Sequence, residues 1–213
     1  AAAITYCRPN SRPVAVGSVD ALKRRDFNDW TFRFVMWIGF ATVPIGIAGL
    51  RETDVVLDVS LQLARLLQAR GVAVLLTRTS DVDVDLPPRV ALANSSGADA
   101  FVSIHANALT MERPDVNGIE AFFFASGSEA ERSRQLAEAV QEQMMAISPG
   151  TTDRGIKPGR FFVIRRTTMP STLVEMGFVT GRLDAPRLRD PSYRRRMALA
   201  LAAGILDYLR RTP

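Results

Sequence analysis

The 213-residue chain has very few of the residues that most often reveal a site or a compartment. Its only cysteine is Cys7, so no intrachain disulfide can form and the cysteine content does not indicate a redox compartment. Its only histidine is His105, which excludes every metal motif that needs two histidines. No internal repeat or low-complexity tract is visible, so repeat architectures are excluded as well.

Lysine is also scarce, because Lys23 and Lys157 are the only two among 27 basic residues. The net charge of +5 and the pI near 10.1 would suit a protein that binds phosphates. Much of the excess, however, lies near the C-terminus without the interleaved aromatic residues that stack on single-stranded bases. These arginines are Arg187, Arg189, Arg194, Arg195, Arg196, Arg210 and Arg211. We therefore expect no nucleic-acid partner.

The composition is that of one globular domain, with 47% hydrophobic and 23% charged residues. Residues 1–30 show no sustained period, which predicts a tail or linker before a domain over 31–213. Residues 34–50 carry no charge, and the length of this uncharged run is near the lower limit for a membrane span or a signal segment. Glycine and proline interrupt this stretch, so we favour a buried strand over 31–38 followed by a glycine-rich loop. Membrane association stays open.

The hydrophobic pattern predicts alternating helices and strands over the rest of the chain. Apolar residues at helical spacing predict helices over 53–70, 86–94, 129–145 and 193–209. Short apolar runs predict strands over 72–76, 100–104, 119–124, 161–164 and 172–174. This alternation predicts an α/β fold, a three-layer sandwich with a mainly parallel twisted sheet flanked by helices.

Polar side chains end two of the predicted strands, and a third lies before the first helix. His105 follows one strand, Glu175 follows another, and Glu52 precedes the helix. Because ligand sites of open parallel sheets lie at the carboxyl ends of the strands, these residues are the first candidates for a site. Glu52 and His105 are of the type that binds Zn²⁺, and Glu175 could act as a base. The alternatives are a hydrogen-bonded His105, a Glu52 that stabilises the helix dipole, and a Glu175 paired with an arginine.

Several separated motifs resemble, in order, one known family. They are GLRETDVVL (49–57), LTR (76–78), RVALAN (89–94), FVSIHANA (101–108), RGIK (154–157) and MPSTLVEMGF (169–178). From about residue 46 to its end, the chain resembles the zinc-dependent N-acetylmuramoyl-L-alanine amidases of the Amidase_3 type. The resemblance implies that Glu52 and His105 bind zinc and that Glu175 is the catalytic carboxylate. It also implies hydrolysis of the amide between muramic acid and L-alanine in peptidoglycan, in the periplasm or outside the cell, although no convincing export signal is visible.

The chain departs from the family at the first zinc ligand. In the family this ligand is a histidine in a loop of sequence Asp-Pro-Gly-His-Gly-Gly, whereas an ungapped alignment back from Glu52 places Trp37 there. Indole has no lone pair for a metal, so we expect impaired activity unless Cys7, Asp26 or Asp29 supplies a ligand. We interpret the first 45 residues or so as frame-shifted or degenerate. A non-catalytic peptidoglycan-binding or regulatory protein is the alternative function, and the oligomeric state stays open.

Overall fold

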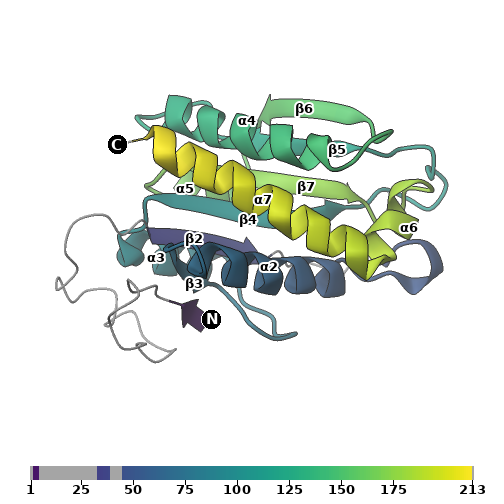
Figure 1. Ribbon diagram of the computed structural model, residues 1–213, viewed down its shortest axis with the longest axis horizontal. Helices are drawn as coiled ribbons and strands as arrows, with labels where there is room; N and C mark the ends of the chain where they lie inside the picture. The colour runs from purple at the N-terminus through teal and green to yellow at the C-terminus, as the bar shows by residue number, and fades with distance from the viewer. Residues whose placement is uncertain (1, 5–32, 39–44, 213) are drawn as a thin grey trace.

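A computed structural model of the chain describes residues 2–4, 33–38 and 45–212. Within these ranges, the strands form one seven-stranded sheet with the order β1-β3-β2-β4-β7-β5-β6 (Figure 1). The strands are β1 (Ala2–Ile4), β2 (Arg33–Ile38), β3 (Ala73–Leu76), β4 (Ala100–Asn107), β5 (Ile119–Phe123), β6 (Asp153–Pro158) and β7 (Ser171–Phe178). The pairs β1–β3 and β5–β7 are antiparallel and all other pairs are parallel, so the sheet is mainly parallel as predicted.

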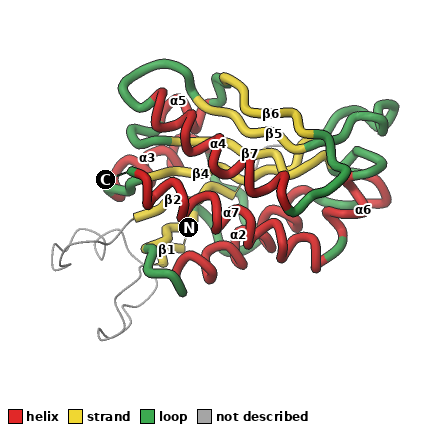
Figure 2. The backbone as a smooth tube through the Cα atoms, turned by 45° about the horizontal axis from the view of Figure 1, so that its top comes forward, coloured by secondary structure: helices red, strands yellow, loops and turns green. Residues whose placement is uncertain are grey.

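Helices cover both faces of this sheet and complete three layers, which confirms the predicted architecture. Helices α2 (Glu52–Gln68), α4 (Ala130–Ala146) and α7 (Pro191–Arg211) pack on one face, and Figure 1 looks onto this layer. Helices α3 (Leu86–Ser96) and α5 (Phe162–Arg166) pack on the other face. The short helix α6 (Asp184–Arg189) and the 3₁₀ helix η1 (Ile47–Gly49) belong to connections. Figure 2 shows the helices on either side of the strands.

The central strand β4 is buried on both faces, which explains its continuous apolar run. Val102 and Ile104 contribute to the core under α2, α4 and α7. Phe101 contributes to the second core, under α3 and α5. Because side chains alternate along a strand, Ser103 and His105 project to the same face as Phe101. The face that carries His105 is therefore the α3 and α5 face.

The predicted strand over 161–164 is wrong, because Phe162–Arg166 forms helix α5. Val163 and Ile164 are buried in the second core, and a short apolar run of this kind does not distinguish a strand from one buried helical turn. The sequence analysis also missed the edge strand β6, whose glycine and proline are unusual in a central strand but suit a sheet edge.

In the uncharged stretch 34–50, the described residues 34–38 and 45–50 contain no helix that could cross a membrane. Its described parts form β2, which confirms the predicted first strand of the domain, and the 3₁₀ helix η1. More widely, none of the helices in the described ranges is long and apolar enough for a transmembrane span. The predicted tail over 1–30 lies outside the described residues except for β1, which pairs with β3.

The packing of α7 against α4 depends on the absence of a side chain at Gly204. A Cβ atom there would lie 2.6 Å from the carbonyl oxygen of Ala139 and 2.7 Å from Cα of Val140. We expect Gly204→Ala to lower the free energy of unfolding by roughly 1–3 kcal/mol, because backbone atoms must move to admit the methyl group. Urea denaturation would measure this loss. Ala203→Leu, which adds bulk at the exposed neighbouring position, is the control and should change stability little.

Candidate functional site

Three titratable side chains form a row across adjacent strands. His105 on β4 lies opposite Glu175 on β7, and Glu175 in turn lies opposite Glu120 on β5. Residues opposite one another in a sheet project to the same face, so all three lie on the α3 and α5 face. His105 and Glu175 stand near the carboxyl ends of parallel strands, as the sequence analysis expected for a site.

Glu52, the first residue of α2, reaches this row from the neighbouring helix. The helix dipole favours a carboxylate at this position, and the buried Arg78 fixes the same turn by donating to the carbonyl oxygen of Thr53 at 3.3 Å. Oε1 of Glu52 accepts a hydrogen bond from the backbone N–H of Ala106 at 3.2 Å. The same oxygen lies 3.0 Å from Nδ1 of His105. Glu52 therefore stabilises the N-terminus of α2 and also contacts the imidazole of His105.

The imidazole of His105 is held at both ring nitrogens. Nε2 lies 3.0 Å from Oγ of Ser103, and Nδ1 faces Glu52. The ring is 20% exposed and the Glu52 side chain 11%, so the pair is accessible from solvent only in part. If Nε2 carries the ring proton and donates to Ser103, the lone pair of Nδ1 points toward the carboxylate.

The pair fits two positions of a zinc site but does not complete one. A carboxylate oxygen and an imidazole nitrogen bind Zn²⁺ at about 2.0–2.2 Å, so donor atoms 3.0 Å apart are compatible with one coordination shell. Within the described ranges, no group of three or more His, Cys, Asp and Glu residues could hold a metal ion. The suggested additional ligands Cys7, Asp26 and Asp29 lie outside those ranges. Trp37 of β2 is in register with Ser103, one strand away from the pair.

Glu175 is a buried carboxyl group that forms no ion pair with any residue in the described ranges. In the part of the chain that the structure describes, its Oε2 has no hydrogen-bond partner and no arginine forms an ion pair with it. Burial raises its pKa well above the ordinary value, and repulsion from Glu52 and then Glu120 adds to the effect. A carboxyl group of this kind holds a proton where an ordinary one would have lost it, which suits a group that transfers protons.

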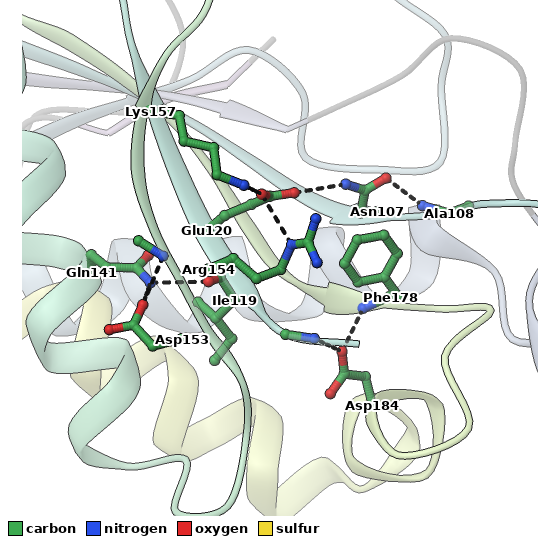
Figure 3. Close-up of polar contacts among 12 residues, drawn as sticks. Asn107, Ala108, Ile119, Glu120, Gln141, Asp153, Arg154, Lys157, Phe178 and Asp184 are labelled. Atoms are coloured by element: carbon green, nitrogen blue, oxygen red, sulfur yellow. Dashed lines mark hydrogen bonds and ion pairs between the residues drawn. The ribbon is translucent and has the colours of Figure 1, made fainter. Parts of the chain in front are cut away.

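Sequence reasoning missed the third member of the row. Glu120 is 3% exposed, and its Oε2 forms ion pairs with Arg154 and Lys157 of β6. Its Oε1 accepts a hydrogen bond from Asn107 at 3.2 Å (Figure 3). The sequence did contain one indication of this residue, because Glu120 is an acidic residue within the otherwise apolar strand β5. Its partners come from a strand that the hydrophobic pattern did not reveal.

These features define a class: an α/β sheet protein with a carboxylate–imidazole pair and a buried proton-binding carboxyl group at the carboxyl ends of its central strands. Residues 41–207 match the family model Amidase_3, described as N-acetylmuramoyl-L-alanine amidase. The chain belongs to this family. The match confirms the resemblance found in the sequence, whereas the roles of Glu52, His105 and Glu175 stay predictions.

Relatives and solved structures agree with this assignment. The chain is 39% identical over 162 residues to the N-acetylmuramoyl-L-alanine amidase LytC of Bacillus subtilis. This alignment covers 76% of this chain and 32% of LytC. Among solved structures, amidase AmiC2 of Nostoc punctiforme superposes with a TM-score of 0.79 at 40% identity, over 84% of this chain and 98% of AmiC2. The catalytic domain of CwlV from Paenibacillus polymyxa gives 0.77 at 32% identity, with coverage of 84% and 98%. The chain therefore spans about a third of LytC but nearly all of the two solved domains.

Proposed function

We propose that this chain is a zinc-dependent N-acetylmuramoyl-L-alanine amidase domain that hydrolyses the amide between muramic acid and L-alanine in peptidoglycan. The observation that carries the proposal is the Glu52–His105 pair beside the buried Glu175, in a chain of the Amidase_3 family. The substrate places the activity in the cell envelope, periplasmic or extracellular. Residues 31–213 would form the catalytic domain.

Glu52 and His105 would hold the zinc ion, which when bound would polarise the amide carbonyl and acidify a water molecule. Ser103 would keep the imidazole oriented through Nε2, and the N–H of Ala106 would hold the Glu52 carboxylate in place. Glu175 would take a proton from the attacking water and give it to the departing amine of L-alanine. Its raised pKa brings its proton affinity nearer to neutrality, where one group can perform both transfers.

The products of digestion test this proposal. The purified 213-residue chain, supplied with zinc, should release L-alanine amino groups from peptidoglycan without creating new reducing sugar ends. Elemental analysis should find about one zinc ion per chain, and His105→Ala should lower both the zinc content and the amino-group release, because it removes one of the two donors found in the described ranges. Arg195→Ala, at an exposed position of α7, is the control that should change neither.

The same experiment separates the enzyme from a non-catalytic peptidoglycan-binding protein. That alternative is favoured by the two-donor set of the described residues. A chain that cosediments with peptidoglycan but holds no zinc and releases no amino groups would support it. Such a result would refute the hydrolytic proposal.

A further inference from the structure

The row of titratable residues continues past Glu175 to a pair of cations. Glu120 follows Glu175 in the register, and β6 follows β5 in the sheet, so the order from the zinc-binding pair outward is His105, Glu175, Glu120 and then the cations of β6. Nε of Arg154 lies 3.1 Å from Oε2 of Glu120, and Nζ of Lys157 contacts the same oxygen (Figure 3).

These cations carry more charge than Glu120 neutralises. One carboxylate faces a guanidinium and an ammonium group, which leaves one positive charge in excess. Glu120 is almost fully buried, whereas the side chains of Arg154 and Lys157 are 31% and 39% exposed. Arg154 binds Glu120 through Nε alone, and within the described ranges its two Nη atoms have no acceptor. These donors are available to an anion from solvent.

Aromatic rings and the buried carboxylate hold both cations in place. The guanidinium of Arg154 lies 5.2 Å from the ring centre of Phe178, and the ammonium of Lys157 lies 6.0 Å from that of Phe122. Phe178 ends the strand that carries Glu175. A cation fixed by a ring and a carboxylate loses less conformational freedom on binding a ligand than a mobile surface side chain.

The order of the row indicates which part of the substrate the cations would meet. In the proposed reaction, Glu175 gives its proton to the departing amine. The peptide therefore leaves on the side of the Glu52–His105 pair where Glu175 lies. Arg154 and Lys157 lie farther along that same side. We propose that they form a subsite for a carboxylate of the stem peptide, close to the alanine whose amide bond is cut. This inference rests on the proposed function and adds a determinant of substrate choice.

Two substrates that differ only in this carboxylate test the subsite. They are muramoyl peptides in which the residue after L-alanine is either γ-linked D-glutamate, with a free α-carboxylate, or its α-amide. With the zinc-loaded chain, we expect kcat/KM for the acid to exceed that for the amide by about tenfold, mainly through KM, since a charge-assisted hydrogen bond is at stake. Arg154→Gln and Lys157→Gln should each reduce this preference. Arg154→Lys should retain part of it, and Arg195→Gln, remote on α7, should retain all of it.

A binding measurement keeps the test independent of catalysis. The released peptides, L-Ala-γ-D-Glu-L-Lys and its α-amide, would be titrated by calorimetry into the chain and the same variants. Tighter binding of the acid that is reduced in Arg154→Gln supports the subsite even if the chain hydrolyses nothing, in which case the proposed activity alone fails. Equal affinity and equal kcat/KM for acid and amide in the unchanged chain would overturn the subsite, even if hydrolysis proceeds.

Discussion

Glu175→Gln is expected to abolish most of the activity while making the folded chain more stable at neutral pH. The amide keeps the shape of the carboxyl group but cannot take up and return a proton. Loss of a general acid–base typically lowers kcat by roughly 10²–10⁴-fold, and we expect a decrease in this range. The KM should change much less, because Glu175 acts on the bond being cut.

The gain in stability follows from the raised pKa of Glu175. In the unfolded chain this carboxyl group loses its proton near its ordinary pKa of 4.5, whereas the folded protein retains it to higher pH. The folded state then binds more protons than the unfolded state, so stability falls as pH rises from about 4.5 toward the raised pKa and stays reduced above it. Glu175→Gln removes this cost. Its melting temperature should exceed that of the unchanged chain at pH 7, and the difference should disappear below about pH 4.5.

Thermal unfolding of the metal-free protein between pH 4 and 8 would measure the effect, with kcat determined on the zinc-loaded protein. Glu142→Gln is the matched control, because Glu142 is an exposed acid on α4. It should leave both the activity and the pH profile unchanged. An equally active Glu175→Gln variant would remove Glu175 from the mechanism. A variant less stable at pH 7 would contradict the inferred burial cost.

Asp184→Ala is expected to destabilise the fold strongly, although Asp184 has no role in the proposed proton transfers. The Asp184 side chain is buried, and its Oδ2 accepts hydrogen bonds from the backbone N–H of Gly118 at 2.7 Å and of Phe178 at 3.0 Å (Figure 3). The carboxylate thus joins the start of β5 to the end of β7. Alanine leaves both donors buried without a partner. At about 1.5–3 kcal/mol for each of the two hydrogen bonds to a charged group, the expected loss is roughly 3–6 kcal/mol.

Urea denaturation would measure this loss, with Asp115→Ala as the control. Asp115 forms an exposed ion pair with Arg113 in the same region, and its removal should cost less than about 1 kcal/mol. Asp184→Asn keeps an acceptor oxygen and should lie between the two. Asp184→Ala could instead unfold at the same urea concentration as the unchanged chain. That result would mean that water or a backbone shift satisfies both N–H donors, and that the carboxylate does not hold β5 and β7 together.

Much of the fold could be predicted because its strands are buried on both faces and its main helices are amphipathic. Helix α2, for example, buries Val55, Val59 and Leu63, and the chain turns at Gly71 with a positive φ of 95°. The sequence could not identify β6, because an edge strand has one partner and tolerates Gly155 and Pro158. It misassigned α5 because four consecutive apolar residues have no decisive period.

The candidate site was predictable to the extent that its residues interrupt apolar runs. His105 and Glu175 do so at strand ends, and the structure places them opposite each other on adjacent strands, with Glu52 of α2 in contact with His105. Glu120 lies near the start of its strand, and its partners depend on the pairing of β5 with β6, which a local pattern does not contain. The raised pKa of Glu175 was also not visible in the sequence, because it arises from burial and from carboxylates on two other elements.

The position of α7 has a consequence for how the chain is made. This helix contacts both α2 and α4 and lies between them in Figure 1. The ribosome produces α2 and α4 well before it reaches residues 191–211, so the nascent chain carries their apolar faces without the helix that separates them. Closure of that layer must therefore follow synthesis of α7, and until then the emerging polypeptide exposes apolar surface of the kind that promotes aggregation.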